Sequence, residues 1–414
     1  MILLFFLVLT FYAILSCTKL FLASLEIRRQ KDLSITLEKT AFISLGYGNS
    51  ALAAPQACEE PHPHVKDRYG EKIDENNITV LQPILGGDPE LENCLTQNLK
   101  NAPQANFIWL IDDDDLLGQE AAKKAIAKIN HGKVKIMLNP KPPQDVNPKT
   151  AKLGYGIKIV ESEFIAILDD DTILAPESLK KAAAIARSGN LVTGLPIYSA
   201  RANLLSRLIT GFVNSNSILT YLPTSFFKIN NTINGMFSLM RLQDINIGDF
   251  DKILKNVTDD YALAQIFRNK GLGIFQTIII ASISTTITSI EHYNSLIKRW
   301  FIFAKIYLRQ NLNLALTFLI ILPAILPFFL LILAVLSGKF SLVILAIAVL
   351  FLKSLAVHKL FVMLGFKAYK ADSFFEIIAE IIMPLQFFLA AIKPQKIVWR
   401  KQSFFLNKIG MIKL

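Results

Sequence analysis

Residues 164–172 read FIAILDDDT, in which five apolar residues are followed by three carboxylates and a threonine. A short, continuous apolar run of this kind is typical of a strand that is buried on both faces. The acidic triplet begins where the strand ends, and a helix is expected to start at Pro176. Ligands of open α/β sheets bind beyond the carboxyl ends of the strands, so Asp169, Asp170 and Asp171 are candidate binding residues.

Three similar apolar runs come earlier in the chain, at residues 78–84, 107–111 and 134–138. Helices are expected between them, from Asp88 to about Lys100 and from Gln119 to Ile129. Strands that alternate with helices predict an α/β domain whose sheet is mostly parallel and whose crossovers are right-handed.

A second acidic cluster, Asp112 to Asp115, follows the strand at 107–111. Two such clusters at one edge of a sheet repel each other unless a cation lies between them. Carboxylate oxygens suit Mg²⁺ or Mn²⁺, which keep bound water and share ligands with substrate phosphates. The pattern indicates a metal–diphosphate site, and the alternative is a pair of solvated loops, because Asp is common in turns.

Two further motifs lie nearer the end of this domain. Asp259 and Asp260 open a helical run. They are either first-turn charges at a helix N-terminus or, for Asp260, a general base that faces the pocket. Arg299 and Trp300 lie in a basic, aromatic helix just before an apolar segment. Arg299 either clamps a phosphate or, together with Trp300, anchors the helix at a membrane surface.

Of the 414 residues, 52% are hydrophobic and only 19% are charged, against about 25% charged in a typical soluble domain. This composition excludes a disordered chain, and three cysteines exclude a disulfide framework. The apolar residues gather at 1–18, 313–337, 340–366 and 373–392. About 20 apolar residues cross a bilayer, so we expect the first three segments to span a membrane. The fourth carries Glu376 and Glu380 on one helical face, which predicts an interfacial or re-entrant position.

Basic residues set the expected orientation. Lys19, Arg28 and Arg29 follow the first apolar segment, which favours an uncleaved anchor whose C-terminal side is cytoplasmic. Basic residues also flank the later spans, so we expect a cytoplasmic α/β domain and a net charge of +11 that faces anionic lipid. The expected location is a bacterial inner membrane, with a eukaryotic endomembrane as the alternative. No nucleic acid is expected as a partner, because a nucleic-acid-binding motif is lacking.

The expected organisation has five parts: an anchor at 1–25, a linker at 26–77, the α/β domain at 78–310, membrane segments at 311–392 and a basic tail at 393–414. The linker is rich in proline. Its Cys58, His62 and His64 could bind a metal, although a surface segment is the favoured interpretation.

From about Val80 to Arg309, the order of the motifs resembles that of the ceramide glucosyltransferase family. This is family 21 of the inverting GT-A glycosyltransferases, and it has bacterial, hopanoid-associated relatives. The chain departs from the family pattern at four points: Leu296 replaces a Gln or Arg, Ala151-Lys152 replaces a pair of Asn, Asp259 replaces Glu conservatively, and the proline-rich insert before Val80 has no counterpart. The matching motifs are Gln82–Pro89, Ile111–Asp115, Asn147-Pro148-Lys149, Asp169–Asp171 at the DXD position, Gly235–Arg241, Asp259-Asp260-Tyr261, Arg299-Trp300 and Val398-Trp399-Arg400.

The resemblance implies a GT-A domain with a Rossmann-like mixed sheet, flanked by N-terminal and C-terminal transmembrane helices. It implies transfer of one sugar, such as glucose, from a UDP-sugar donor to the hydroxyl of a lipid acceptor such as ceramide or a hopanoid. Asp169 and Asp171 would hold Mg²⁺ or Mn²⁺. Residues 201–228 fit an amphipathic element that admits the lipid, or an ordinary half-buried helix.

The resemblance also assigns roles to single residues. Asp112, Lys149 and Asp169 would contact the nucleotide sugar. Arg299 would stabilise the departing diphosphate, and Trp300 would pack the loop beneath it. Asp260 would deprotonate the acceptor hydroxyl, whose attack inverts the anomeric carbon.

Two other classes of protein remain open. A processive polysaccharide synthase shares the GT-A core, but it needs a complete Gln-x-x-Arg-Trp motif and more membrane helices, and Leu296 argues against it. A non-catalytic membrane protein with a decayed core is the other class, and three intact acidic motifs argue against decay.

Overall fold

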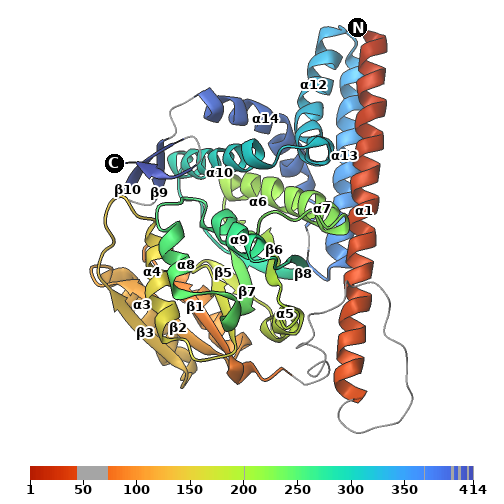
Figure 1. Cartoon of the computed structure of the whole chain (residues 1–414). Coiled ribbons are helices and arrows are strands. Elements are labelled where there is room, and N and C mark those ends of the chain that lie inside the picture. Colours follow the sequence, from red (N-terminus) through yellow and green to blue (C-terminus); the bar gives the residue numbers. More distant parts are fainter. Residues whose placement is uncertain are drawn as a thin grey trace.

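The computed structural model describes residues 1–43, 73–199, 201–367, 369–392, 396–399, 402–407 and 410–413. The candidate metal ligands of the proline-rich segment, Cys58, His62 and His64, lie outside the described residues. The described part consists of an α/β domain and a bundle of long apolar helices that stands beside it (Figure 1).

An eight-stranded mixed sheet forms the centre of the α/β domain. Its strand order is β3-β2-β1-β4-β7-β6-β8-β5, and β3, β2, β1 and β4 run parallel to one another. β7 pairs antiparallel with both β4 and β6. The prediction of an α/β fold with a mixed sheet is therefore confirmed. The strands are β1 (Ile78–Pro83), β2 (Asn106–Asp112), β3 (Val134–Asn139), β4 (Phe164–Leu168), β5 (Thr172–Leu174), β6 (Leu191–Tyr198), β7 (Phe237–Arg241) and β8 (Ile274–Ile283).

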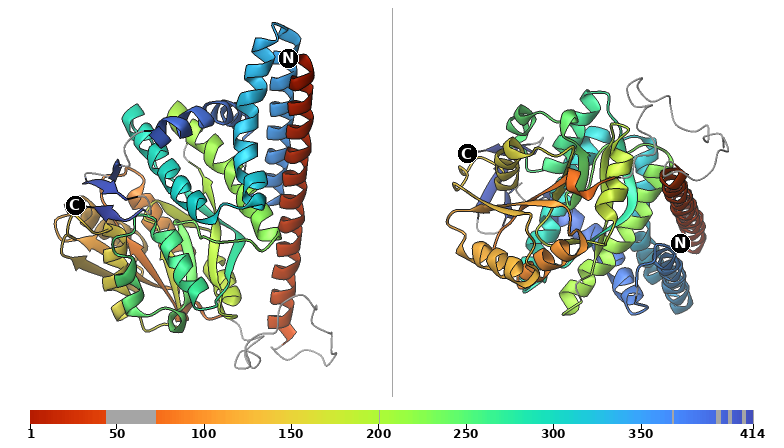
Figure 2. Two further views of the ribbon diagram at one scale, coloured as in Figure 1. Left: turned by 45° about the horizontal axis from the view of Figure 1, so that its top comes forward. Right: turned by 90° about the horizontal axis from the view of Figure 1, so that it is seen from below.

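Helices cover both faces of this sheet, because successive side chains of each strand point into opposite cores. Val80 and Trp109 lie in one core, which α2, α3 and α5 close, and Leu81 and Leu110 lie in the other, which α4, α8 and α9 close. Figure 2 shows the sheet between these two layers. The helices are α2 (Leu91–Asn101), α3 (Leu116–Ile129), α4 (Pro148–Gly156), α5 (Ser178–Ala186), α8 (Ile247–Ile253) and α9 (Asp259–Asn269).

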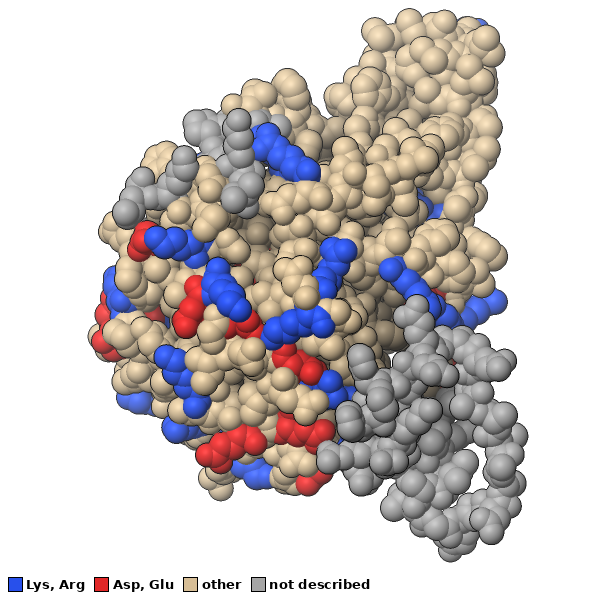
Figure 3. Space-filling view, viewed as in Figure 1, with Lys and Arg blue, Asp and Glu red and all other residues tan. Residues whose placement is uncertain are grey.

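Three apolar helices stand together beside the domain: α1 (Ile2–Ile43), α12 (Leu322–Leu336) and α13 (Phe340–Met363). Figure 3 shows that charged side chains gather on the α/β domain and are nearly absent from the projecting end of this bundle. Large apolar side chains such as Phe6, Phe329 and Phe351 are exposed there. With α14 (Asp372–Ile392), four helices of the described chain are long and apolar enough to cross a membrane.

The first helix is longer than expected, because it continues without a break past the boundary placed at residue 25. Its second half lies along the α/β domain, where Ile27 is buried. Gln30 donates a hydrogen bond to the Gln276 carbonyl oxygen (2.8 Å) and accepts one from the Ile278 N–H (2.9 Å). These bonds to β8 keep the polar half of the helix ordered on the protein surface.

Glu376 and Glu380 of α14 share one face, and both pair with Lys353 of α13. Lys353 Nζ lies 2.6 Å from Glu376 Oε1, so the two carboxylates of α14 share one cation inside the protein. The opposite face exposes Leu385 and Leu389. In Figure 1, α14 runs across the direction of α1 and α13. Its interfacial position stays a prediction.

The remaining helices pack between the bundle and the sheet. They are α6 (Leu204–Asn216), α7 (Leu222–Phe226), α10 (Ile290–Asn311) and α11 (Leu314–Leu316). π-helical turns follow α6 at Ser217–Tyr221 and α11 at Thr317–Ile321. Each turn precedes a helix with proline in its first turn, Pro223 or Pro323, which has no N–H for the regular helical ladder.

The C-terminal region was expected only as a basic tail, but its described residues form a three-stranded antiparallel sheet. The strands are β9 (Lys396–Trp399), β10 (Gln402–Leu406) and β11 (Ile412–Lys413). Ile397 and Phe404 pack on Ile302 and Ile306 of α10, and this burial explains why the segment folds. Arg400 of the tail motif lies outside the described residues.

Candidate active site

The first acidic cluster ends β2 and is neutralised by a lysine. Asp112 Oδ2 lies 2.9 Å from Nζ of Lys152 on α4. The same ammonium donates a hydrogen bond to the Ile84 carbonyl oxygen at the end of β1 (2.7 Å). Burial raises the pKa of Asp112 above its usual value, and Lys152 opposes that rise. The other oxygen, Asp112 Oδ1, is buried without a hydrogen-bond partner among the described residues.

The second acidic cluster ends β4, and its first residue pairs with another lysine of the same helix. Lys149 Nζ lies 2.6 Å from Asp169 Oδ1 and 3.4 Å from Asp259 Oδ2, and it donates a hydrogen bond to the Gly235 carbonyl oxygen (2.9 Å). Burial raises the pKa of Asp169 to about 7, although Lys149 opposes the rise. Burial alone would lower the pKa of Lys149, but Asp169 and Asp259 raise it above its usual value.

Helix α4 thus supplies one cation to each acidic cluster. Asn147 caps the helix through its side chain, and Pro148 occupies the first turn. Lys149 and Lys152 are three residues apart and therefore lie on one side of the helix. In the sequence, Lys152 stands out only as a departure from the family pattern. The capped helix start, followed by two lysines at this spacing, is the signal that could have identified it.

Asp260 lies in the first turn of α9, beside Asp259 and close to Lys149. Burial, with the negative charge of Asp259 next to it, raises the pKa of Asp260 to about 7. A methyl group added at Gly235 would lie 3.8 Å from Asp260 Oδ2, so the backbone of Gly235 borders this carboxylate. A small cavity adjoins these groups, and its lining includes Lys149, Thr150, Ile233, Phe250, Asp259 and Asp260.

Asp170 and Asp171 have hydrogen-bond partners that differ from the ion-pair partner of Asp169. Asp170 Oδ2 accepts a hydrogen bond from the Leu85 N–H (2.8 Å), and Asp171 accepts hydrogen bonds from the hydroxyls of Thr172 and Thr285. Burial, reinforced by Asp171 and Asp170, raises the pKa of nearby Asp88 to about 6.

These carboxylate oxygens are the donor type that Mg²⁺ and Mn²⁺ prefer, and the local excess of negative charge favours a cation. Among the described residues, however, no three His, Cys, Asp or Glu side chains converge on one point. At Asp169, an ammonium already occupies one oxygen. A metal here therefore fits only if water and a bound phosphate complete its ligands, as is usual for Mg²⁺.

Trp300 and Leu296 of α10 lie in an apolar cluster near β4. Trp300 stacks on Phe212 of α6, with 6.0 Å between the ring centroids and 13° between the planes. Met236 packs in the same cluster, and its carbonyl oxygen accepts a hydrogen bond from the Asp169 N–H (3.0 Å). Leu296 is buried there, where a Gln or Arg head group would lack solvent. Arg299 is half-buried on the same helix.

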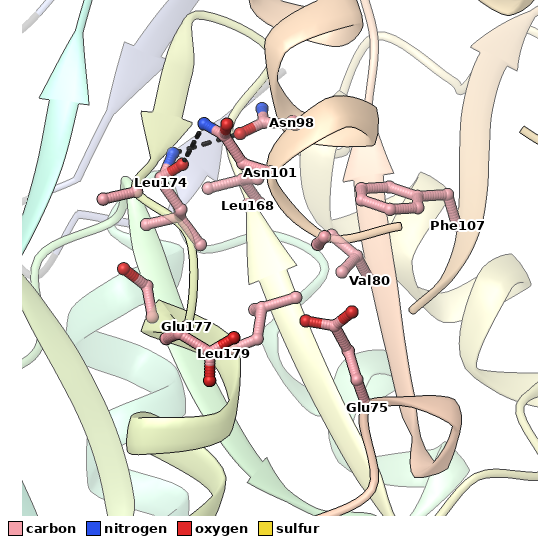
Figure 4. A pocket seen from close by; sticks show the side chains of 12 residues that line it. Glu75, Val80, Asn98, Asn101, Phe107, Leu168, Leu174, Glu177 and Leu179 are labelled. Carbon is pink, nitrogen blue, oxygen red and sulfur yellow. Dashed lines mark hydrogen bonds between the residues drawn. The ribbon is translucent and has the colours of Figure 1, made fainter. Parts of the chain in front are cut away.

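A second pocket lies on the opposite side of β4, between α2 and α5 (Figure 4). Asn98 of α2 donates a hydrogen bond to the Thr172 carbonyl oxygen (2.7 Å) and accepts one from the Leu174 N–H (3.0 Å). Asn101 donates to the Leu174 carbonyl oxygen (2.8 Å). These bonds hold β5 in place directly after the acidic triplet. Asn98 and Asn101 therefore help to fix the backbone that follows Asp171.

Comparison with known proteins gives a family and distant structural similarities. A model described as glycosyl transferase family 21 matches residues 37–412. A mannosyltransferase from Pyrobaculum calidifontis, solved with GDP-Man and Mn²⁺, is 12% identical over 91% of this chain and 98% of its own, with a TM-score of 0.45. A glucosyl-3-phosphoglycerate synthase from Mycobacterium tuberculosis, solved with Mg²⁺ and uridine diphosphate, is 12% identical over 54% of this chain and 78% of its own, with a TM-score of 0.34. No curated protein matches the chain.

Proposed function

The chain belongs to glycosyl transferase family 21, and from that premise we propose that it moves one sugar from a UDP-sugar to the hydroxyl of a membrane lipid, with inversion. The observation that carries the proposal is the group formed by Asp169, Lys149, Asp259 and Asp260. Asp260 is a buried carboxylate with a raised pKa close to a cation, which suits a general base, and Asp169 of the same group follows the end of β4, where ligands of open α/β sheets bind.

In the proposed reaction, Asp260 accepts the proton of the acceptor hydroxyl. The hydroxyl oxygen attacks the anomeric carbon on the face opposite the diphosphate, and the bond from that carbon to the phosphate oxygen breaks. Asp112 binds the nucleoside; its buried Oδ1 has no hydrogen-bond partner among the described residues, so a donor group of the ligand would satisfy it. Lys149 and Arg299 stabilise the charge that develops on the departing diphosphate.

Mg²⁺ or Mn²⁺, held by Asp169 and Asp171 together with the donor phosphates, would supply further neutralisation of the leaving group. We therefore expect a chelator such as EDTA to abolish transfer, and added Mg²⁺ or Mn²⁺ to restore it. The measurement is sugar transfer by purified protein in detergent, before and after metal is returned. Ca²⁺ in place of Mg²⁺ serves as a control for ionic strength. Unchanged turnover in the chelator would remove the metal from the proposal.

We also propose that α1, α12 and α13 span the membrane and that the α/β domain lies on its cytoplasmic side. The support is the exposed apolar surface of the bundle and the basic residues that follow the first apolar segment in the sequence, Arg28, Arg29 and Lys31, which the positive-inside rule places in the cytoplasm. The acceptor's apolar tail would then stay in the lipid, while its hydroxyl reaches Asp260.

The lipid acceptor is tested by mass spectrometry of lipids from cells that carry the intact chain, cells that lack it, and cells that carry Asp260→Asn. We expect a lipid that is one hexose heavier only with the intact chain. The class of that lipid distinguishes ceramide from a hopanoid. A long polymer in place of a glycolipid would favour a processive synthase, and no new product in any strain would favour a non-catalytic protein.

A further inference from the structure

The C-terminal sheet contacts the segment that leads into the Asp259-Asp260 motif. The Ile412 N–H donates a hydrogen bond to the Lys255 carbonyl oxygen (2.8 Å), and the Val257 N–H donates to the Gly410 carbonyl oxygen (3.2 Å). Between these bonds, Asn256 and Met411 form an antiparallel bridge. Residues 410–412 thus pair with residues 255–257 as a short strand would.

The same segment is held from its other side by Asn147. The Asn147 backbone N–H donates to the Leu254 carbonyl oxygen (2.7 Å), and its side-chain amide donates to the Asn256 carbonyl oxygen (2.8 Å). Asn147 also caps α4, where its Oδ1 accepts from the Lys149 N–H (3.0 Å). One buried residue therefore links the segment at 254–257 to the helix that carries Lys149.

Packing against α10 fixes the C-terminal side of this contact. Gly410 has a φ of +85°, and a methyl group added there would lie 2.8 Å from Ile306 Cδ1. Ile412 and Val257 are buried together with Ile302 and Ile306. The contact is therefore apolar as well as hydrogen-bonded, and only glycine fits at residue 410.

We propose that residues 410–412 are a positioning element for the transferase site, which holds the segment at 254–257 so that Asp260 faces the acceptor and Lys149 stays between Asp169 and Asp259. The inference rests on the proposed role of Asp260 as the base. Val257 precedes Asp259 by only two residues, so a shift of the segment is passed directly to the first turn of α9. A misplacement of about 1 Å can lower turnover about 100-fold in enzymes.

Two matched variants at one residue test the proposal. Ile412→Pro removes the N–H that bonds Lys255, whereas Ile412→Val keeps the N–H and a β-branched apolar side chain. Turnover is expressed per UDP-binding site, so that unfolded protein is not counted. We expect about 10-fold or more loss of kcat for Ile412→Pro, near-normal kcat for Ile412→Val, and UDP affinity within about twofold of the intact protein for both.

A second variant on the opposite side of the segment separates positioning from general stability. Asn147→Ala and Ile412→Pro both loosen residues 254–257, so their effects on kcat should be less than multiplicative when combined. If Ile412→Pro yields no UDP-binding protein, Gly410→Ala provides the same comparison. Normal kcat per UDP-binding site in both Ile412→Pro and Gly410→Ala would overturn the inference. Fully multiplicative effects of Asn147→Ala and Ile412→Pro on kcat would also overturn it. Full activity of Asp260→Asn would instead reject Asp260 as the general base. The two experiments therefore distinguish failure of the positioning role from failure of the proposed function.

Discussion

We expect replacement of Asp260 by Asn to abolish sugar transfer while leaving UDP binding largely intact. The amide keeps the size of the side chain but cannot accept the proton of the acceptor hydroxyl, and loss of a general base lowers turnover about 100- to 10,000-fold. The measurement is transfer from a UDP-sugar, together with the Kd of UDP by calorimetry. Asp251→Asn, at an exposed carboxylate of the neighbouring α8, is the matched control and should retain activity. Full activity of Asp260→Asn would exclude Asp260 as the base.

The raised pKa of Asp260 gives this prediction a pH signature. A base must be ionised, so activity is fully present above the pKa of about 7 and is lost as the pH falls through that value. An ordinary Asp, with a pKa near 4, would keep its activity down to about pH 5. The pH profile of kcat/KM measures the difference. A profile that stays flat between about pH 5 and pH 8 would contradict the role of the buried carboxylate.

Replacing Lys149 by Met should eliminate transfer and destabilise the protein. Three carboxylates, Asp169, Asp259 and Asp260, would lose their shared cation in a buried setting. Removal of one partner from a buried ion pair costs about 3–5 kcal/mol, unless the carboxylates take up protons. Without the positive charge of Lys149, which lowers the pKa of Asp260, that pKa rises further, so the base becomes protonated at neutral pH.

The measurements for Lys149→Met are transfer activity, its pH profile and thermal unfolding in detergent. We expect residual activity only at alkaline pH and a lower Tm. Lys158→Met, at an exposed position just beyond α4, is the matched control and should behave like the intact protein. Normal activity of Lys149→Met at pH 7 would show that the bridge to Asp169 and Asp259 is dispensable.

The sequence predicts the central strands of the sheet well because their apolar residues form unbroken runs. The run at 164–168 predicts β4 at its observed limits, and its aspartates lie at the edge of the sheet where ligands bind. The capped start of α4 and its two lysines can be found in the sequence, but the pairing of Lys152 with Asp112 follows only from how α4 packs beside β2.

Long-range contacts also explain the other differences between expectation and structure. Helix α1 extends beyond its apolar run because Gln30 finds backbone partners on β8, far away in the sequence. The spacing of Glu376 and Glu380 predicts a shared face, but Lys353 as their partner follows only from how α13 and α14 pack. Residues 393–414 are basic in composition, and this composition does not predict that apolar side chains in the segment pack on α10.

The packing of α1 against α12 and α13 has a consequence for biosynthesis. The first helix leaves the ribosome before the α/β domain, and its two partners follow only after that domain has been translated. During that interval, its buried residues Phe5 and Tyr12 lack the contacts with α12 and α13 that they have in the finished protein. Domains generally fold as units during synthesis, so we expect the α/β domain to form first and the proposed membrane bundle to assemble late. A nascent chain arrested before α12 would therefore be exposed to membrane quality control.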